Sequence, residues 1–324
     1  MQKNYFNSLN INFSHGIMFH HFHDRNIHKK SQGSISAKEF EKILNFIGFE
    51  NILDPKEFIN LLKSNKLKKK HVCLTFDDNL KSQFDIALPI LEKYNLKAFF
   101  FIYSSTLTKN PDLLELYRYF RTNYYKSINH FYKDFNKNVI KKYGKTKIKN
   151  FFINNQKKIL FWKSNFRIYT VKDIQFRFLR DKFLSKKEYK KFMFKLFNLK
   201  KFNYKKVLRK LFMNSKDLNK LNKLGHEIGL HSNSHPTRLE DLSKINQHNE
   251  YNINKKILKS FVKKINIISM SHPSGSYNQN TISILKNMKI QIGFRSDLGK
   301  KNKNNSILEI ARMDHSIINK YLKT

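Results

Sequence analysis

The sequence has few of the residues that cross-link or interrupt a chain. Its 324 residues include one cysteine, five prolines and nine glycines. A single cysteine excludes both a disulfide framework and a zinc site built from cysteines. No stretch approaches eighteen consecutive apolar residues, so we expect no transmembrane helix. The N-terminal segment lacks the apolar core and cleavage site of a signal peptide, and we therefore expect a cytoplasmic protein.

Acidic residues are also scarce. The chain has 64 Lys and Arg against 24 Asp and Glu, a formal net charge of +40. This excess favours an anionic partner, and composition leaves open nucleic acid, lipid phosphate, a phosphorylated sugar or mere drift toward lysine. No nucleic-acid-binding motif accompanies the charge, so no specific nucleic-acid partner is expected, whereas peripheral contact with an anionic membrane stays open. The 30 Phe and 15 Tyr exclude a disordered chain.

Short apolar runs alternate with amphipathic segments in two parts of the chain. Within residues 11–104, the runs GIMF, HVCLTF and KAFFFIYS are typical of buried strands. Between the first two runs, Ser36 and Glu39 have the spacing of a helix capping box. After residue 215 the runs HEIGLHS, INIISM and IQIGF continue the pattern. Such alternation predicts an α/β fold with parallel strands, as a sheet or a barrel.

The middle of the chain, residues 105–215, has a different composition. It contains 30 Lys and Arg, six Asp and Glu, one glycine and one proline, with apolar residues at broadly helical intervals. Long helices need few turn residues, and their solvated faces tolerate many lysines. We predict a mostly helical, basic insertion here, between residues 1–104 and 216–324 of one larger domain. A solvated helical face and a surface for an anionic ligand are both open interpretations.

Two adjacent carboxylates end a predicted strand in the run LTFDD. In parallel α/β folds the carboxyl ends of strands carry the functional groups. Neighbouring residues point to different sides, so Asp77 and Asp78 can take different roles. The pair alone is a weak signal, since Asp78 could equally cap a helix.

Two histidines follow a later strand in the run HEIGLHSNSH. His231 and His235 are four residues apart, a spacing that lets both imidazoles reach one metal ion if the loop turns helically. Two histidines and one carboxylate leave coordination positions open, as hydrolytic rather than structural metal sites do. The alternative is a pair of unrelated polar loop residues.

Two further segments follow predicted strands. In SHPSGSYN, Pro273 and Gly275 set a tight turn whose backbone N–H groups could face a reacting carbonyl, although an ordinary turn needs the same residues. In GIMFHHFHD, His20, His21 and His23 follow the first strand. The near-neutral pKa of histidine suits proton donation to a leaving amine, and we expect one of the three to serve this role.

The ordered set LTFDD, HSNSH and HPSGSYN resembles the first three motifs of the polysaccharide deacetylase family, also called NodB-homology carbohydrate esterases. The resemblance spans about residues 11–104 and 216–315 and leaves out the insertion. It implies a distorted (β/α) barrel and a divalent metal, most often Zn²⁺. It also implies that Asp77 is the general base and that Asp78, His231 and His235 bind the metal.

The sequence departs from the family pattern in two ways. The usual C-terminal catalytic histidine is missing, but MFHH resembles a permuted version of the family in which it lies near the N-terminus, which makes His20 the expected general acid. The third motif has Ser271 and Ser274 where most members have a base-bracing arginine and an aromatic residue. Arg312 or Arg295 would then orient the base, and the turn at Ser274 and Gly275, through the Ser274 N–H, would hold the oxyanion.

These features together predict a metal-dependent hydrolase that removes an N-acyl group, most simply N-acetyl, from an amino sugar in a glycan or a glycan precursor. Such an enzyme hydrolyses a carbon–nitrogen bond other than a peptide bond. The sugar stays open and could be phosphorylated, nucleotide-linked or lipid-linked, as in the synthesis of cell-envelope glycans. Two alternatives remain: a catalytically weakened carbohydrate-binding protein of the same fold, and a deacylase of a non-sugar amide.

Overall fold

The computed structural model describes residues 5–165, 169–299 and 306–323. The chain divides into two units, Met1–Asp112 with Lys210–Thr324, called the barrel unit here, and Leu113–Arg209, called the helical unit. Among the described residues, no helix is long and apolar enough to cross a membrane.

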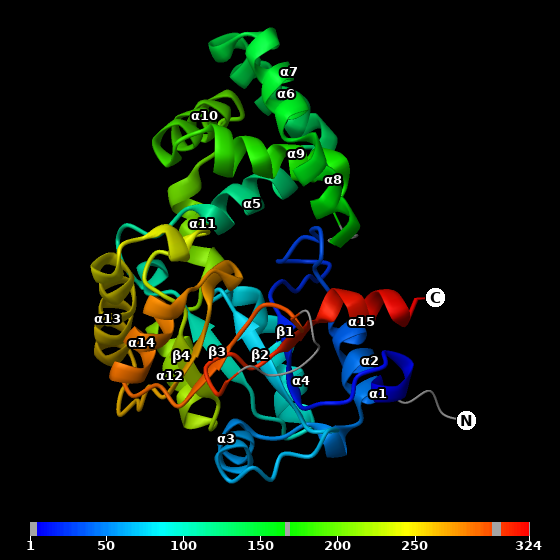
Figure 1. The fold of residues 1–324 in the computed structure, drawn as a ribbon, viewed down its shortest axis with the longest axis vertical. Helices are drawn as coiled ribbons and strands as arrows, with labels where there is room; N and C mark the ends of the chain where they lie inside the picture. The colour runs from blue at the N-terminus through cyan, green and yellow to red at the C-terminus, as the bar shows by residue number, and fades with distance from the viewer. Residues whose placement is uncertain (1–4, 166–168, 300–305, 324) are drawn as a thin grey trace. The chain divides into compact units, whose positions relative to one another are not determined.

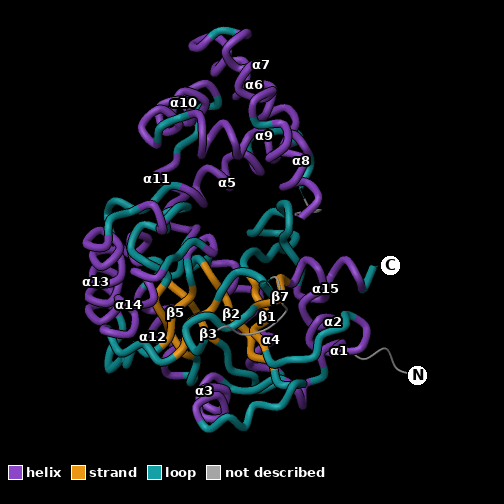
Figure 2. The backbone as a smooth tube through the Cα atoms, in the orientation of Figure 1, coloured by secondary structure: helices purple, strands orange, loops and turns teal. Residues whose placement is uncertain are grey.

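Seven parallel strands form the centre of the barrel unit (Figure 2). Their order across the sheet is β6-β5-β4-β3-β2-β1-β7. Their bounds are β1 His15–Phe19, β2 Val72–Asp77, β3 Phe99–Ile102, β4 Glu227–Leu230, β5 Ser269–Ser271, β6 Ile292–Phe294 and β7 Arg312–Asp314. Most of their side chains are buried on both faces, which explains the continuous apolar runs of the sequence.

The two edges of this sheet approach each other and nearly close a barrel. Phe294, at the end of β6, forms a parallel bridge with Ile310, which lies just before β7. The Ile310 N–H donates to the Gly293 carbonyl, the Gly293 N–H donates to the Ile307 carbonyl, and the Arg295 N–H donates to the Ile310 carbonyl, each at 2.8 Å. The predicted distorted (β/α) barrel is therefore confirmed.

Helices surround these strands (Figure 1). The α-helices of the barrel unit are α1 Tyr5–Ser8, α2 Ala37–Ile47, α3 Pro55–Lys63, α4 Leu88–Lys93, α12 Ser215–Lys223, α13 Lys244–Phe261, α14 Gln279–Asn287 and α15 His315–Tyr321. Shorter helical turns are η1 Phe49–Asn51, η2 Gln83–Ala87, η3 Ser104–Leu107, η5 Leu239–Asp241 and η6 Pro273–Gly275. Helix α2 begins at the capping box that the sequence predicts: the Ser36 side chain accepts from the Glu39 N–H, and Glu39 accepts from the Ser36 N–H.

The helical unit contains no strand among its described residues (Figure 2). Its helices are α5 Leu114–Asn123, α6 Ile128–Tyr143, α7 Lys145–Asn154, α8 Gln156–Asn165, α9 Val171–Phe178, η4 Leu179–Phe183, α10 Lys186–Leu199 and α11 Tyr204–Leu211, the last of which crosses the unit boundary. Aromatic side chains form much of its interior. Phe120, Phe131 and Phe135 are fully buried, and the ring centroids of Phe120 and Phe197 lie 4.6 Å apart.

Candidate metal centre and active site

The predicted chemical groups lie where strands end. Asp77 is the last residue of β2, and Asp78 follows it with a φ of 80°, which turns the chain out of the strand. His231 directly follows β4, and Ser271 ends β5. Because parallel strands point the same way, their carboxyl ends bring these residues together at one end of the barrel.

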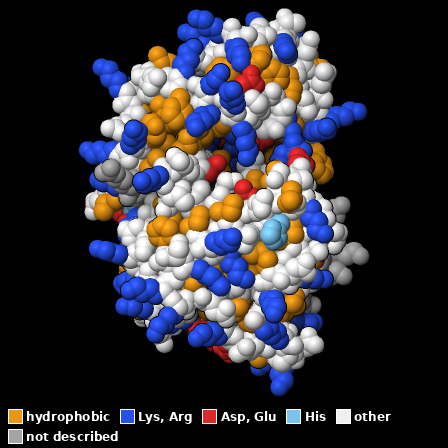
Figure 3. All heavy atoms as spheres, turned by 90° about the vertical axis from the view of Figure 1, so that its left-hand side faces the viewer, with side chains coloured by type: hydrophobic (Ala, Val, Ile, Leu, Met, Phe, Trp, Pro, Cys, Tyr) orange, Lys and Arg blue, Asp and Glu red, His pale blue; other side chains and the backbone are white. Residues whose placement is uncertain are grey.

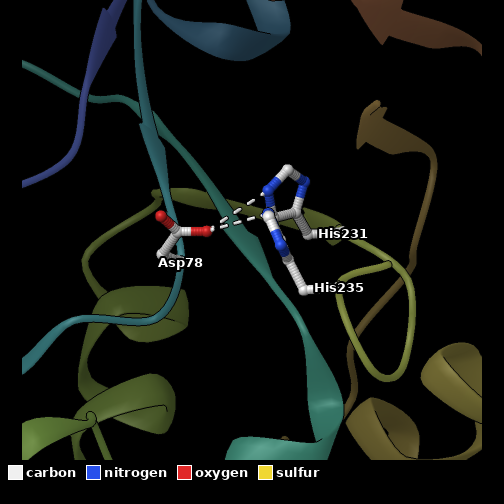
Figure 4. Close-up of side chains that lie close together, drawn as sticks. All are labelled: Asp78, His231 and His235. Carbon is white, nitrogen blue, oxygen red and sulfur yellow. Dashed lines mark ion pairs between the residues drawn. The ribbon is translucent and has the colours of Figure 1, made fainter. Parts of the chain in front are cut away.

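Asp78, His231 and His235 form a buried cluster (Figure 4). Asp78 Oδ1 lies 3.3 Å from His235 Nε2 and 3.5 Å from His231 Nε2, and the ligand atoms of the three residues all lie within 4.8 Å of one another. Asp78 Oδ1 is buried and accepts no hydrogen bond from any described residue. A buried carboxylate oxygen without a donor, facing two imidazole nitrogens, fits a divalent cation.

The two imidazoles are held by their surroundings. His231 Nδ1 donates to the Ser271 carbonyl at 2.9 Å, so in the neutral ring Nε2 is the unprotonated nitrogen, and this atom faces Asp78. The His231 N–H donates to Asn254 Oδ1 of α13. In the loop between the histidines, the Glu250 carboxylate of α13 accepts from the N–H of Ser234 and from its hydroxyl. Neither Asn254 nor Glu250 was predicted from the sequence, where both are polar residues between the apolar runs HEIGLHS and INIISM.

Asp77 is held by Arg312, a β7 residue that is 1% exposed. Arg312 Nη1 and Nη2 donate to the two oxygens of Asp77, each at 2.8 Å, and Nη2 also donates to Ser271 Oγ. Ser271 Oγ in turn donates to Asp77 Oδ2 at 3.2 Å. Arg295 does not make this contact; its Nη2 donates to the Leu298 carbonyl. Ser271 and Arg312 thus occupy the place beside Asp77 that the resemblance assigns to one arginine.

Neighbouring charges shift the pKa values of Asp77, Asp78 and His231. Burial opposes the charge of Asp77, but the adjacent Arg312 guanidinium outweighs burial and lowers the pKa of Asp77 below its ordinary value. Burial acts the same way on Asp78, and the imidazoles of His235 and His231 lower its pKa far below the ordinary range. Burial would lower the pKa of His231, but Asp77 and Asp78 raise it. Both carboxylates are therefore ionised at neutral pH.

His20 lies beside both carboxylates. Its Nε2 is 3.8 Å from Asp77 Oδ2 and 3.9 Å from Asp78 Oδ2, and its side chain is 28% exposed. The Gln83 side-chain amide donates to the backbone carbonyls of both His20 and Asp77, which fixes the two segments together. Gln83 was not predicted from the sequence.

The other histidines of this region are placed differently. The His21 ring stacks on the His20 ring with 6.1 Å between the two ring centroids, and both residues lie beyond the end of β1 at Phe19. His23 Nδ1 pairs with Ser34 Oγ. Both ring nitrogens of His315 contact backbone carbonyls.

The turn at 273–275 has the strained geometry of a tight loop. Ser274 and Gly275 have φ values of 54° and 68°. A Cβ on Gly275 would lie 2.1 Å from Ser296 Oγ, so the position requires glycine. The N–H groups of Gly275 and Ser276 donate to the carbonyls of His272 and Pro273. The exposed Ser274 remains the residue whose N–H is predicted to face the substrate.

Comparison with known proteins places the chain in a family. The sequence profile described as polysaccharide deacetylase matches residues 64–121 and 182–293, more than half of the chain. The chain therefore belongs to the polysaccharide deacetylase family. The match enters residues 105–215 from both sides, which corrects the expectation that the insertion lies wholly outside the resemblance. His20 and Arg312 lie outside the matched residues.

Solved structures share the fold. A Streptococcus pyogenes deacetylase, PplD, in complex with acetate is 18% identical with a TM-score of 0.53, and the alignment covers 95% of this chain and 96% of that one. IcaB from Ammonifex degensii is 12% identical with a TM-score of 0.55, covering 97% and 98%. A de-N-acetylase from Aggregatibacter actinomycetemcomitans is 15% identical with a TM-score of 0.54, covering 95% and 99%. A search of curated protein sequences found no significant match.

Proposed function

We propose that the protein is a metal-dependent N-deacetylase of amino sugars in a glycan or glycan precursor. One observation supports this most: a buried Asp78 oxygen that accepts no hydrogen bond from a described residue faces two imidazole nitrogens at 3.3 and 3.5 Å. Asp77, which is bonded to Arg312 and lies 4.0 Å from His231 Nε2, supplies a second carboxylate for acid–base chemistry. Membership of the family supplies the substrate class.

Asp78, His231 and His235 are the residues that would hold the metal. Two nitrogen donors and one oxygen donor suit Zn²⁺, which we propose as the ion. Bound there, it would supply Lewis acidity to a water molecule and to the acyl carbonyl.

Asp77 accepts the proton of the attacking water. The Arg312 guanidinium occupies one side of the carboxylate and keeps it ionised and fixed in orientation. Ser271 Oγ completes this arrangement by bonding to both partners. A base that is held rigidly loses little entropy when it meets its proton.

His20 donates a proton to the departing amine. Its Nε2 lies just under 4 Å from the nearest oxygen of each of the two carboxylates, and its partial exposure leaves one side open toward solvent and substrate. Without a proton the amide nitrogen would have to depart as an anion, which is a very poor leaving group, so an acid at this position is required. The Ser274 N–H would stabilise the oxyanion.

Chelation and metal addition test the proposal. We expect protein treated with a chelator to release no acetate from an N-acetylated chitooligosaccharide, and Zn²⁺ to restore release. Assaying a phosphate-linked, a nucleotide-linked and a lipid-linked N-acetyl sugar beside it identifies the preferred form. If none of these sugars is deacetylated by metal-loaded protein that still binds them, the protein is a carbohydrate-binding relative instead.

The role of His20 has its own test. The His20→Gln variant should lose most activity on the amide but little on p-nitrophenyl acetate, whose leaving group needs no proton. His21→Gln changes the ring stacked beside it and is the matched control, expected to keep both activities. Equal losses on amide and ester in His20→Gln would remove the acid assignment.

A further inference from the structure

Helices α7 and α8 expose large apolar side chains on a helical unit whose interior is already well packed. Ile153 and Leu160 are each 55% exposed, Phe161 is 67% exposed and Trp162 is 38% exposed. The opposite sides of these helices are satisfied, since Ile148 is buried and Ile159 packs with Ile174 and Phe178. Trp162 is partly held by the core, since its ring packs edge-on against Phe178, whereas Ile153, Leu160 and Phe161 are more than half exposed. Exposed apolar clusters of this kind mark interaction surfaces.

The same segment is strongly cationic. Residues 135–172 contain eleven Lys and Arg and no Asp or Glu. Within α7 and α8, five lysines are exposed around the apolar side chains: Lys145, Lys147, Lys149, Lys157 and Lys158. The apolar side chains and the cations therefore belong to two consecutive helices. Figure 1 labels both helices, α7 and α8.

We propose that this α7–α8 surface, made of Ile153, Leu160, Phe161, Trp162 and their flanking lysines, docks on an anionic membrane. Lysines bind the negative headgroups while Leu, Phe and Trp side chains enter the boundary between headgroups and acyl chains. A second copy of the chain is disfavoured because it would bring eleven further cations against the first eleven. A nucleic acid would use the lysines but would leave the aliphatic Ile153 and Leu160 in water.

Trp162 makes the proposal directly measurable because it is the only tryptophan of the chain. Its emission therefore reports on this surface and on no other part of the protein. With the full-length protein, vesicles of phosphatidylcholine containing about one third phosphatidylglycerol should shift the Trp162 emission to shorter wavelength. Brominated lipids in the same vesicles should quench it. This test does not depend on the proposed deacetylase activity.

Two variants separate the apolar and the charged contributions. Leu160→Ser with Phe161→Ser should weaken sedimentation with anionic vesicles about tenfold or more, and Lys157→Gln with Lys158→Gln should do the same by removing two cations. Matched controls lie in the barrel unit: Ile245→Ser removes an apolar side chain that is 70% exposed, and Lys69→Gln with Lys70→Gln removes two consecutive exposed lysines. Both controls should bind as the unchanged protein does.

The outcomes are distinct. Circular dichroism of each variant shows whether the helices remain folded, and the unchanged protein with brominated lipids tests the surface even if a variant unfolds. Binding to anionic vesicles without any change in Trp162 emission would overturn the proposal, because another surface would then be responsible. A second result would also overturn the proposal: the protein binds a 20-nucleotide RNA but not the vesicles, and this RNA binding depends on the lysines but not on Phe161.

Discussion

The two units of the chain differ in their balance of basic and acidic residues. The helical unit has 28 Lys and Arg against five Asp and Glu, whereas the barrel unit has 36 against 19. On the face shown in Figure 3, basic side chains are scattered over the whole surface and acidic ones are few. In the barrel unit, buried acids such as Asp77 and Asp78 each face a cation or imidazole, so charge there is arranged inside the fold. The difference teaches that net charge alone does not locate chemistry; buried charge with defined partners does.

The sharpest test of this comparison changes one buried carboxylate in each unit. Asp77→Asn should lower deacetylation about a thousandfold, because the general base is lost. Asp173→Asn, which changes a buried carboxylate bonded to Thr170 and Tyr132 in the helical unit, should leave the rate per folded molecule unchanged. Initial rates are compared after circular dichroism has fixed the folded fraction. Equal losses in both variants would mean that the chemistry is not confined to the barrel.

The next largest effect concerns stability. Arg312→Met leaves Asp77 buried without its cation and should lower the free energy of unfolding by about 3–5 kcal/mol, measured by urea denaturation. Lys142→Met breaks an exposed ion pair with Glu188 in the helical unit and should change stability little. Adding Asp77→Leu to Arg312→Met should recover stability without activity. Similar losses from both single variants would contradict the contrast between buried and exposed charge.

The pH dependence of stability should also arise in the barrel unit. Burial lowers the pKa of His15 and of His226 from 6.5 to about 4. Between pH 4 and 6.5 the unfolded chain binds more protons than the folded chain. The free energy of unfolding therefore falls as the pH decreases from 6.5 to 4, by up to about 1.4 kcal/mol per pH unit for each histidine. When the free energy of unfolding is measured by urea denaturation at several pH values in this range, it should depend less steeply on pH in His15→Gln and in His226→Gln. An unchanged slope in both would show that neither ring is buried neutral.

The smallest expected effect is that of Glu227, which changes stability with pH in the direction opposite to the two histidines. Burial raises the pKa of Glu227, which accepts from Ser269 Oγ, to about 7 from 4.5. The folded chain then binds more protons between these values, so this residue makes stability fall as pH rises from 4.5 to 7. Glu227→Gln should stabilise the protein at pH 8 by about 1–2 kcal/mol and leave it unchanged at pH 4. Thermal unfolding at the two pH values measures this, and destabilisation at pH 8 would contradict it.

Much of the barrel could be predicted from the sequence because its strands are buried on both faces. Six of the seven strands coincide with apolar runs; Asp77 directly follows the run HVCLTF, and His231 lies within the run HEIGLHS. The last strand, β7, could not be predicted, since its three residues RMD show no apolar run. Arg312 was therefore only one of two candidates for the contact with Asp77, and three-dimensional structure was needed to choose between them.

The hydrogen bonds that hold the backbone around the site could not be predicted from the sequence either. Gln83, Glu250 and Asn254 are polar residues in helical segments, and periodicity places such residues in solvent. Each instead points toward a strand end and bonds to the backbone there. Only the packing of a helix against the barrel decides which of its polar residues becomes part of the site.

The metal content of purified protein tests the central claim most directly. Elemental analysis should find one divalent ion per chain in the unchanged protein and in Asp77→Asn, and far less in Asp78→Asn, His231→Ala and His235→Ala. Equal metal content in all five proteins would contradict the assignment of Asp78, His231 and His235 as the metal site.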